Sequence, residues 1–157
     1  MEQLSTENER PRLTKSSKTF VVVEDDPTMC RLWGRLLSQI NGLNFVVFSS
    51  AREAIKYLDS EPADVLLTDL VLEEMSGVDV VLKALAKNHD TKIILTSAFP
   101  ETRYDLSPIG CFIHFIKKPY RNLDILRELI LLFMDNADEI SDAEVSEDDR
   151  QLYVWDL

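Results

Sequence analysis

The chain has 157 residues, 45% of them hydrophobic, and a formal net charge of −11. This length suits one domain with a buried core, and the acidic balance argues against a nucleic-acid surface, which needs clustered Lys and Arg. No apolar run approaches the roughly 20 residues of a membrane span. Residues 1–18 lack the apolar centre of a signal peptide, so we expect a cytoplasmic protein without a membrane partner. Cys30 and Cys111 have no partners at metal-ligand spacing, which predicts two small core residues.

The negative charge is concentrated at the C-terminal end. Residues 135–157 hold nine acidic residues and one arginine, so they carry −8 and the rest of the chain only −3. We therefore expect a disordered N-terminal arm (1–18), a folded domain (19–134) and an acidic tail (135–157). The tail ends in the apolar run Leu152 to Leu157. Docking on the chain's own domain and docking on a partner are both compatible with such a run.

Short apolar runs alternate with helical patterns along residues 19–134. The expected strands are Phe20–Val23, Phe45–Phe48, Val65–Leu67, Lys92–Thr96 and Cys111–Ile116. Helical patterns follow each strand, beginning near Pro27, Ser50, Gly77, Glu101 and Leu123; the fourth, Glu101 to Ile109, is short and weakly patterned. This alternation predicts an α/β fold, a doubly wound five-stranded parallel sheet with five helices.

Polar side chains gather where the expected strands end. They are Glu24, Asp25 and Asp26 after the first strand, Asp69 after the third, Thr96 and Ser97 at the fourth, and Lys118 after the fifth. The carboxyl ends of parallel strands lie on one edge of the sheet, so these groups are expected to converge. Hard oxygen ligands suit Mg²⁺. A carboxylate beside that ion, with a lysine to neutralise charge, can act as a nucleophile towards phosphorus.

These residues, in this order, resemble the receiver domain of two-component response regulators. The motifs that carry the resemblance are Val23-Glu24-Asp25-Asp26-Pro27, Asp69 with Gly77 eight residues later, Ser97-Ala98, and Lys118-Pro119. The resemblance covers roughly residues 19–134 and implies the flavodoxin-like fold of a chemotaxis-type, single-domain receiver.

The resemblance implies that Asp69 is the phosphoacceptor. Glu24 and Asp25 would place Mg²⁺ together with Asp69 and the backbone carbonyl of Val71. Lys118 would pair with the phosphoryl group. The bond from Lys118 to Pro119 is expected to be cis, and Asp26, which follows the acidic pair, is left outside the metal shell.

Two further positions match the switch of this family. Ser97 matches the switch hydroxyl, although a one-residue slip would give that role to Thr96. Phe115, three residues before Lys118, matches the aromatic residue that swings inward when the hydroxyl moves. Val71 and Phe99 are apolar where some fast-hydrolysing relatives are polar. We hypothesise that they hinder water and lengthen the phosphoryl lifetime.

The function implied is that of a switch and not of an enzyme. A histidine kinase or phosphotransfer protein would phosphorylate Asp69, and the surface of helix four, strand five and helix five would then change its protein contacts. One alternative is a pseudo-receiver that binds partners without phosphorylation, supported only by Leu72-Glu73, where the family often has Met-Pro. The other is a magnesium-dependent phosphohydrolase of the haloacid dehalogenase kind, which would use Glu24 and Asp26.

Overall fold

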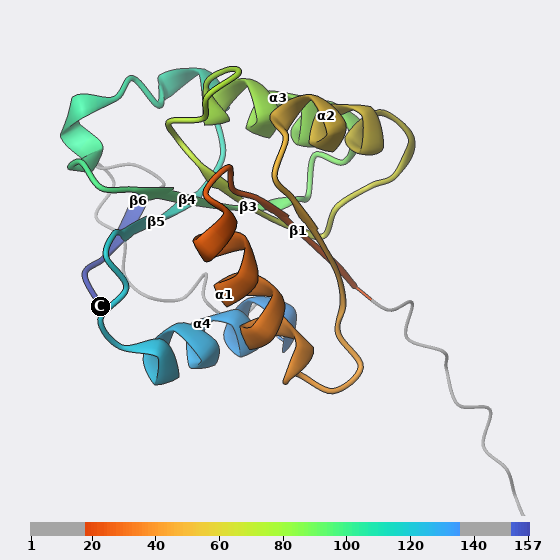
Figure 1. Cartoon of the computed structure of the whole chain (residues 1–157). Coiled ribbons are helices and arrows are strands. Elements are labelled where there is room, and N and C mark those ends of the chain that lie inside the picture. The colour runs from red at the N-terminus through yellow and green to blue at the C-terminus, as the bar shows by residue number, and fades with distance from the viewer. Residues whose placement is uncertain (1–17, 136–151) are drawn as a thin grey trace, which may run out of the picture.

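A six-stranded parallel sheet organises the molecule, with the strand order β2-β1-β3-β4-β5-β6. The computed structural model describes residues 18–135 and 152–157 (Figure 1). Its strands are β1 Thr19–Val23, β2 Asn44–Phe48, β3 Val65–Asp69, β4 Lys92–Ser97, β5 Ile113–Lys117 and β6 Leu152–Trp155. The predicted arm apart from Lys18, and the tail over 136–151, lie outside the described residues.

Helices cover both faces of the sheet, as the doubly wound prediction requires. The four α-helices of the described ranges are α1 Pro27–Ser38, α2 Ala51–Ser60, α3 Gly77–Lys87 and α4 Leu123–Asp135. Figure 1 shows α1 and α4 on one face and α2 and α3 on the other. The predicted fold class is therefore confirmed. No helix in the described part of the chain has both the length and the apolar character needed to cross a bilayer.

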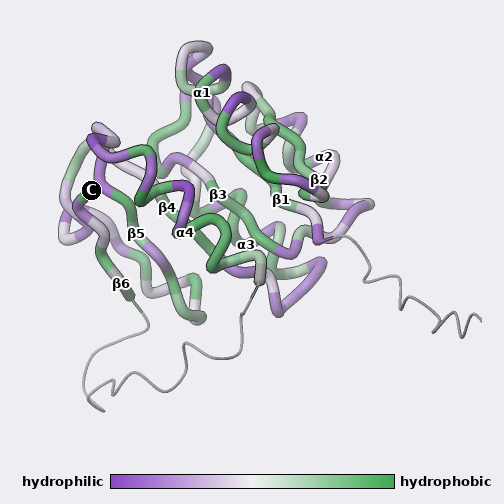
Figure 2. Tube along the Cα trace, turned by 90° about the horizontal axis from the view of Figure 1, so that it is seen from below, coloured by the Kyte–Doolittle hydropathy of each residue, from purple (hydrophilic) through white to green (hydrophobic). Residues whose placement is uncertain are grey.

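Both faces of the sheet are apolar because its strands are buried on two sides. Alternate side chains of β1 go to opposite cores: Val21 packs with α2 and α3, whereas Val22 packs with α1 and α4. Hydrophobic residues accordingly run along the central strands in Figure 2. This continuous burial fixes the register of the strands, so the residues that follow them are held at one edge.

Short polar side chains set the starts of the helices. The Asp26 carboxylate accepts hydrogen bonds from the backbone N–H groups of Thr28 and Met29 and so caps α1. Ser50 caps α2 through Glu53, and Ser76 caps α3. Each cap satisfies donors that a helix start leaves without partners. The role of Asp26 is thus local to α1, which agrees with its exclusion from the metal shell.

The helix predicted between Glu101 and Ile109 does not form as an α-helix. Two single-turn 3₁₀ helices take its place, η1 Glu101–Arg103 and η2 Ser107–Ile109. Pro108 lacks an N–H and disfavours the helical conformation of the residue before it. The Asp105 carboxylate also accepts the Ser107 N–H and hydroxyl, which competes with helical hydrogen bonding. The connection between β4 and β5 is therefore an irregular segment.

The C-terminal end of the chain docks on its own domain. Leu152–Trp155 adds to β5 as a parallel sixth strand, and the Arg121 N–H donates to the Leu157 carbonyl at 3.2 Å. The Trp155 indole donates to Nδ1 of His114 on β5 at 3.3 Å. Of the two alternatives for this run, the structure shows the intramolecular one, and the sheet has one strand more than predicted.

The start of the fifth strand and the burial of the two cysteines also differ from the predictions. The fifth strand begins at Ile113, so Cys111 precedes it. Cys111 and Cys30 are both free thiols of intermediate burial, not full core residues.

Candidate functional site

Three carboxylates meet at the carboxyl ends of β1 and β3. Glu24 and Asp25 follow β1, and Asp69 is the last residue of β3. One oxygen from each lies within 4.8 Å of the others, the only group of this kind found among the described residues. Glu24 is 1% exposed and Asp69 9%. Sheet register alone brings them together, because β1 and β3 are hydrogen-bonded neighbours.

Lys118 joins two of these carboxylates. Its ammonium donates to Oε2 of Glu24 at 2.8 Å and to Oδ2 of Asp69 at 2.7 Å. Burial disfavours the charged ammonium, but the hydrogen bonds to Asp69 and Glu24 outweigh burial, so the pKa of Lys118 is raised. The group therefore stays cationic at neutral pH. The Lys118–Pro119 peptide bond is cis, as predicted.

The site suits a divalent cation on charge grounds. By formal charge, three carboxylates and one ammonium leave two negative charges in excess, and burial raises the pKa of Glu24 above its usual value despite the opposing Lys118. Burial thus disfavours the negative charge of Glu24, and a cation bound beside this carboxylate would stabilise that charge. Oxygen donors from Glu24, Asp25 and Asp69 are the hard ligands that Mg²⁺ prefers, so the residues present fit that ion.

Backbone groups hold the carboxylates in place. The Asp26 N–H donates to Oε1 of Glu24 at 3.1 Å, and the Glu73 N–H donates to Oδ2 of Asp25 at 2.8 Å. The Val71 N–H donates weakly to Oδ1 of Asp69, at 3.4 Å. Each acid is thus oriented by a donor before any ligand arrives, which reduces the reorganisation that binding requires.

Gly77 allows α3 to start directly against the end of β3. A Cβ at this position would collide with the Asp69 carbonyl and lie 2.9 Å from Cα of Leu70. The Gly77 N–H donates to the Leu70 carbonyl at 2.9 Å. The spacing of Asp69 and Gly77 in the sequence therefore has a steric cause: the loop that carries Val71 and Glu73 returns onto the backbone of Asp69.

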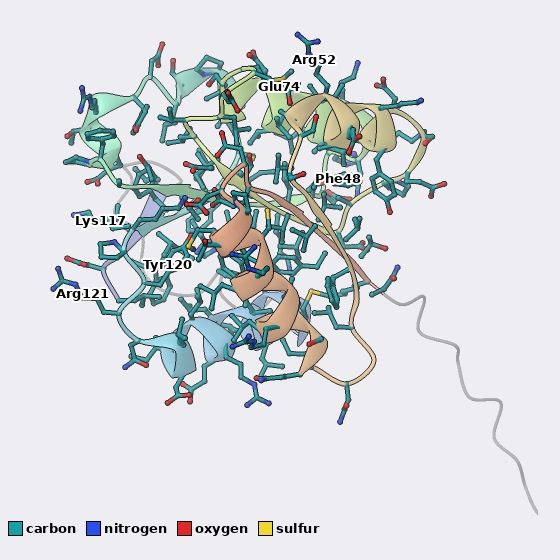
Figure 3. The ribbon with its side chains drawn as sticks, in the orientation of Figure 1. Phe48, Arg52, Glu74, Lys117, Tyr120 and Arg121 are labelled. Atoms are coloured by element: carbon teal, nitrogen blue, oxygen red, sulfur yellow. The ribbon has the colours of Figure 1, made fainter. Side chains whose placement is uncertain are left out.

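The same loop is tied to α2. Glu74 accepts from the Ser50 hydroxyl at 2.9 Å and pairs with the Arg52 guanidinium at 3.1 Å, and Figure 3 shows Arg52 and Glu74 next to each other. Leu72 is 8% exposed and packs with the core. Leu72 and Glu74 thus give this loop fixed contacts without the Met-Pro that the family often has.

The two candidate switch hydroxyls point to opposite faces of the sheet. Ser97 makes a 2.6 Å hydrogen bond to the hydroxyl of Tyr104 and accepts the Phe99 N–H at 3.1 Å. Thr96 alternates with it and so shares the face of Ile94, which packs with α1 and α4. Phe115 is fully buried already, so an inward swing would have to start from a different state.

Two aromatic residues near the site escaped the sequence analysis. Tyr120 follows the cis bond and lies between the end of β5 and α1 (Figure 3), where its ring meets the edge of Trp33 at 5.4 Å. Burial raises the pKa of Tyr120, so the phenol keeps its proton. Tyr104 belongs to the irregular β4–β5 connection. No local sequence pattern marks either contact, because both join residues that are far apart or lie in a segment predicted as helix.

The fold and this cluster together define a receiver-type α/β domain, with acids after β1 and at the end of β3 and a lysine after β5, all at one edge of the sheet. The chain belongs to the response regulator receiver domain family, whose sequence profile matches residues 20–130.

Individual relatives agree with this assignment. A response regulator receiver protein, CpdR of Brucella abortus, is 27% identical over 71% of this chain and 93% of its own length. A cyclic di-GMP phosphodiesterase of Thermotoga maritima is 34% identical over 69% of this chain, but the match spans only 29% of that protein. Response regulator TrrA of Thermotoga maritima, solved in complex with Mg²⁺-BeF, is 28% identical with a TM-score of 0.62, over 74% of this chain and 98% of that one.

Proposed function

We propose that this chain is a phospho-accepting response regulator, with Asp69 as the acceptor. The observation that carries the proposal is the Lys118 ammonium held between Asp69 and Glu24 at 2.7 and 2.8 Å. It places a fixed positive charge beside the one carboxylate that ends a central strand. Charge stabilisation of this kind is the main contribution that a protein makes to phosphoryl transfer.

The bonds that change in the transfer are those of the Asp69 carboxylate and of the donor. A carboxylate oxygen of Asp69 forms a bond to phosphorus while the bond from phosphorus to the donor breaks, and the electron pair leaves with the donor group. The donor is a phosphohistidine of a histidine kinase or phosphotransfer protein, or acetyl phosphate, which releases acetate. Lys118 stays within reach of the phosphoryl oxygens and offsets their charge.

Glu24, Asp25, Asp69 and the backbone carbonyl of Val71 would hold Mg²⁺ in this proposal. The bound ion supplies positive charge that neutralises the oxygens of the phosphoryl group. Asp25 is oriented for this role by the Glu73 N–H. Support comes from the oxygen-only donor set and from the Mg²⁺-BeF complex of TrrA.

The signal would pass through Ser97 to the far side of the sheet. Ser97 would turn to donate to a phosphoryl oxygen, and Phe115 would form the buried wall behind it. The partner surface then comprises the η1–η2 segment, β5 and α4, with β6 as an added border. The partner is a cytoplasmic protein, which recognises this surface and not the end of the sheet that carries Asp69.

We infer a switch and not an enzyme, since the reaction consumes the acceptor. The phosphodiesterase activity in the name of one relative belongs to a protein of which this chain matches 29%, and it is not carried over. Asp26, the second acid that a haloacid dehalogenase would need, caps α1. That contact disfavours the hydrolase alternative.

Intact-mass analysis after incubation with Mg²⁺ and acetyl phosphate tests the proposal. We expect wild type to gain the mass of one phosphoryl group, Asp69→Asn to gain none, and Asp26→Asn to gain it normally, because asparagine caps a helix as well as aspartate does. Absence of the gain in wild type, with phosphohistidine donors also inactive, would favour the pseudo-receiver. Turnover of a phosphate ester that requires Asp26 and not Asp69 would favour the hydrolase.

A further inference from the structure

We propose that Tyr104 is a positioning residue for the switch: its hydroxyl holds Ser97 away from Asp69 until a phosphoryl group competes for that serine. The inference rests on the proposed function. Tyr104 is the C-cap residue of η1, so the competition would transmit occupancy of the acceptor end to the β4–β5 connection.

The Ser97 side chain and the Asp69 side chain lie on opposite faces of the sheet. Side chains alternate along β4, and Ser97 shares the face of Leu95, which packs in the core under α2 and α3. Asp69 continues the other alternation, that of Leu67, which packs with α1 and α4. Ser97 therefore has to rotate about its Cα–Cβ bond before its hydroxyl can meet a phosphoryl group on Asp69.

Rotation of the Ser97 side chain would break its present hydrogen bonds. Ser97 is 1% exposed. Its hydroxyl is hydrogen-bonded to the Tyr104 hydroxyl at 2.6 Å and accepts the Phe99 N–H. It has one proton to donate, and phosphoryl oxygens can only accept. Rotation towards Asp69 exchanges the bond to Tyr104 for a charge-assisted bond to the phosphoryl group, which is the stronger kind.

Tyr104 contacts other parts of the molecule besides Ser97. Its ring packs against Phe115 with centroids 6.5 Å apart and planes tilted by 40°. Tyr104 also lines a cavity of about 670 Å³, whose walls come from the η1–η2 segment, β5 and β6. Phe115 is fully buried and carries no polar atom, whereas Tyr104 is half-buried and hydrogen-bonded. Tyr104 is thus the aromatic residue here that can sense the state of Ser97 directly.

Release of Tyr104 would loosen the part of an irregular segment that lies next to Ser97. The η1 and η2 turns are single turns, joined by Tyr104, Asp105 and Leu106. In this account the fully buried Phe115 stays in place and Tyr104 moves. The consequence of phosphorylation is then a changed wall of the cavity beside β5 and β6.

The test titrates the full chain with beryllium fluoride and Mg²⁺, a phosphoryl mimic, and follows bound fluoride by ¹⁹F NMR. We expect Tyr104→Phe, which keeps the ring and removes the competing hydroxyl, to bind the mimic roughly threefold to tenfold more tightly, the effect of one net hydrogen bond. Tyr57→Phe removes a phenolic hydroxyl from α2, where the ring packs on Phe48, and should bind as wild type does.

A double-mutant cycle separates competition from a general structural effect. Ser97→Ala should weaken binding of the mimic, and Tyr104→Phe added to Ser97→Ala should change nothing more, because no serine remains to be released. Equal tightening by Tyr104→Phe in both backgrounds would overturn the inference, as would unchanged or weaker binding by Tyr104→Phe alone. Failure of wild type itself to bind the mimic would overturn the proposed function and this inference with it.

Discussion

The acceptor end and the output side of this domain are built in opposite ways. The proposed acceptor end, Glu24, Asp25, Asp69 and Lys118, consists of charged side chains that each make at least one hydrogen bond to a neighbour, at 2.7 to 3.4 Å. The output side, residues 98–117 with β6, consists of two single turns, the strand β5 and an added strand. Ser97, the last residue of β4, contacts both: its carbonyl accepts the Lys118 N–H and its hydroxyl bonds that of Tyr104.

In the proposed function, this difference would separate chemistry from signalling. A site that stabilises developing charge works best when its groups do not move, and the buried strands β1 and β3 provide that rigidity. A surface that changes partners needs a segment with few fixed hydrogen bonds, since such segments open at low free energy.

The largest effect is expected from removing the fixed charge of the acceptor end. Lys118→Met should lower the rate of phosphorylation by acetyl phosphate by about 10²–10³-fold, the cost of losing one preorganised group that stabilises the transition state. The neighbouring Lys117→Met keeps Lys118 in place and serves as the matched control. Stopped-flow or quenched mass analysis measures both rates. Similar rates in the two variants would remove Lys118 from the mechanism.

The anchor of β6 comes next. Trp155→Ala should destabilise the chain by about 2 kcal/mol, because it removes a half-buried indole from the α1–α4 core together with the hydrogen bond to His114. Val154, 36% exposed on the same strand, provides the control Val154→Ala, which should cost well under half as much. Urea unfolding measures both. An equal loss would mean that Trp155 does not anchor the strand.

The output side should also be the part that weakens in acid. Burial, assisted by the charge of Lys92, lowers the pKa of His114 from 6.5 to about 4. Between these values the unfolded chain binds a proton that the native chain does not, so stability falls as pH falls through this window. The loss between pH 7 and pH 5 is about 2 kcal/mol. Below pH 4 the contribution is fully lost.

Urea unfolding at the two pH values, with variants, measures this difference. His114→Gln should lack the loss, whereas His89→Gln should keep it because His89 is exposed. Carboxylates of the acceptor end contribute equally to all three proteins and cancel in the comparison. A pH dependence that His114→Gln leaves unchanged would contradict the account.

The smallest effect concerns the rim of the acceptor end. Val71 and Phe99 are 56% and 45% exposed, and the Arg103 guanidinium lies 4.1 Å from the Phe99 ring centroid. If they hinder water, Val71→Asn or Phe99→Gln should shorten the phosphoryl lifetime several-fold. The decay of the added mass over time gives the lifetime. A half-life of seconds for wild type would remove the hypothesis.

Sequence reasoning predicted that Glu24, Asp25, Asp69 and Lys118 lie together because the causes of this clustering are local to strand ends. Asp69 follows a buried apolar run, Lys118 precedes a proline, and the spacing of Asp69 and Gly77 has the steric cause that a Cβ would collide with the strand. The regular alternation of strands and helices then brings the ends together without further information.

The output side was predicted less well, for physical reasons that are also identifiable. The weak helical pattern over Glu101 to Ile109 does not produce an α-helix. The side-chain hydrogen bonds of Asp105 compete with helical ones, and Pro108 disfavours the helical conformation. Docking of Leu152 to Leu157 depends on the edge of β5 and on His114. The sequence of the tail does not indicate that it will meet either of them. The bond between Ser97 and Tyr104 joins a strand end to a segment without a regular pattern.

Hydrogen exchange followed by mass spectrometry on the full chain, with and without Mg²⁺ and acetyl phosphate, tests the central contrast most directly. We predict faster exchange in residues 98–112 on phosphorylation, unchanged or slower exchange in β1 and β3, and no change at all in Asp69→Asn. Faster exchange throughout the acceptor end, or a phosphorylated wild type with no change in residues 98–112, would contradict the division between a fixed acceptor end and a responsive output side.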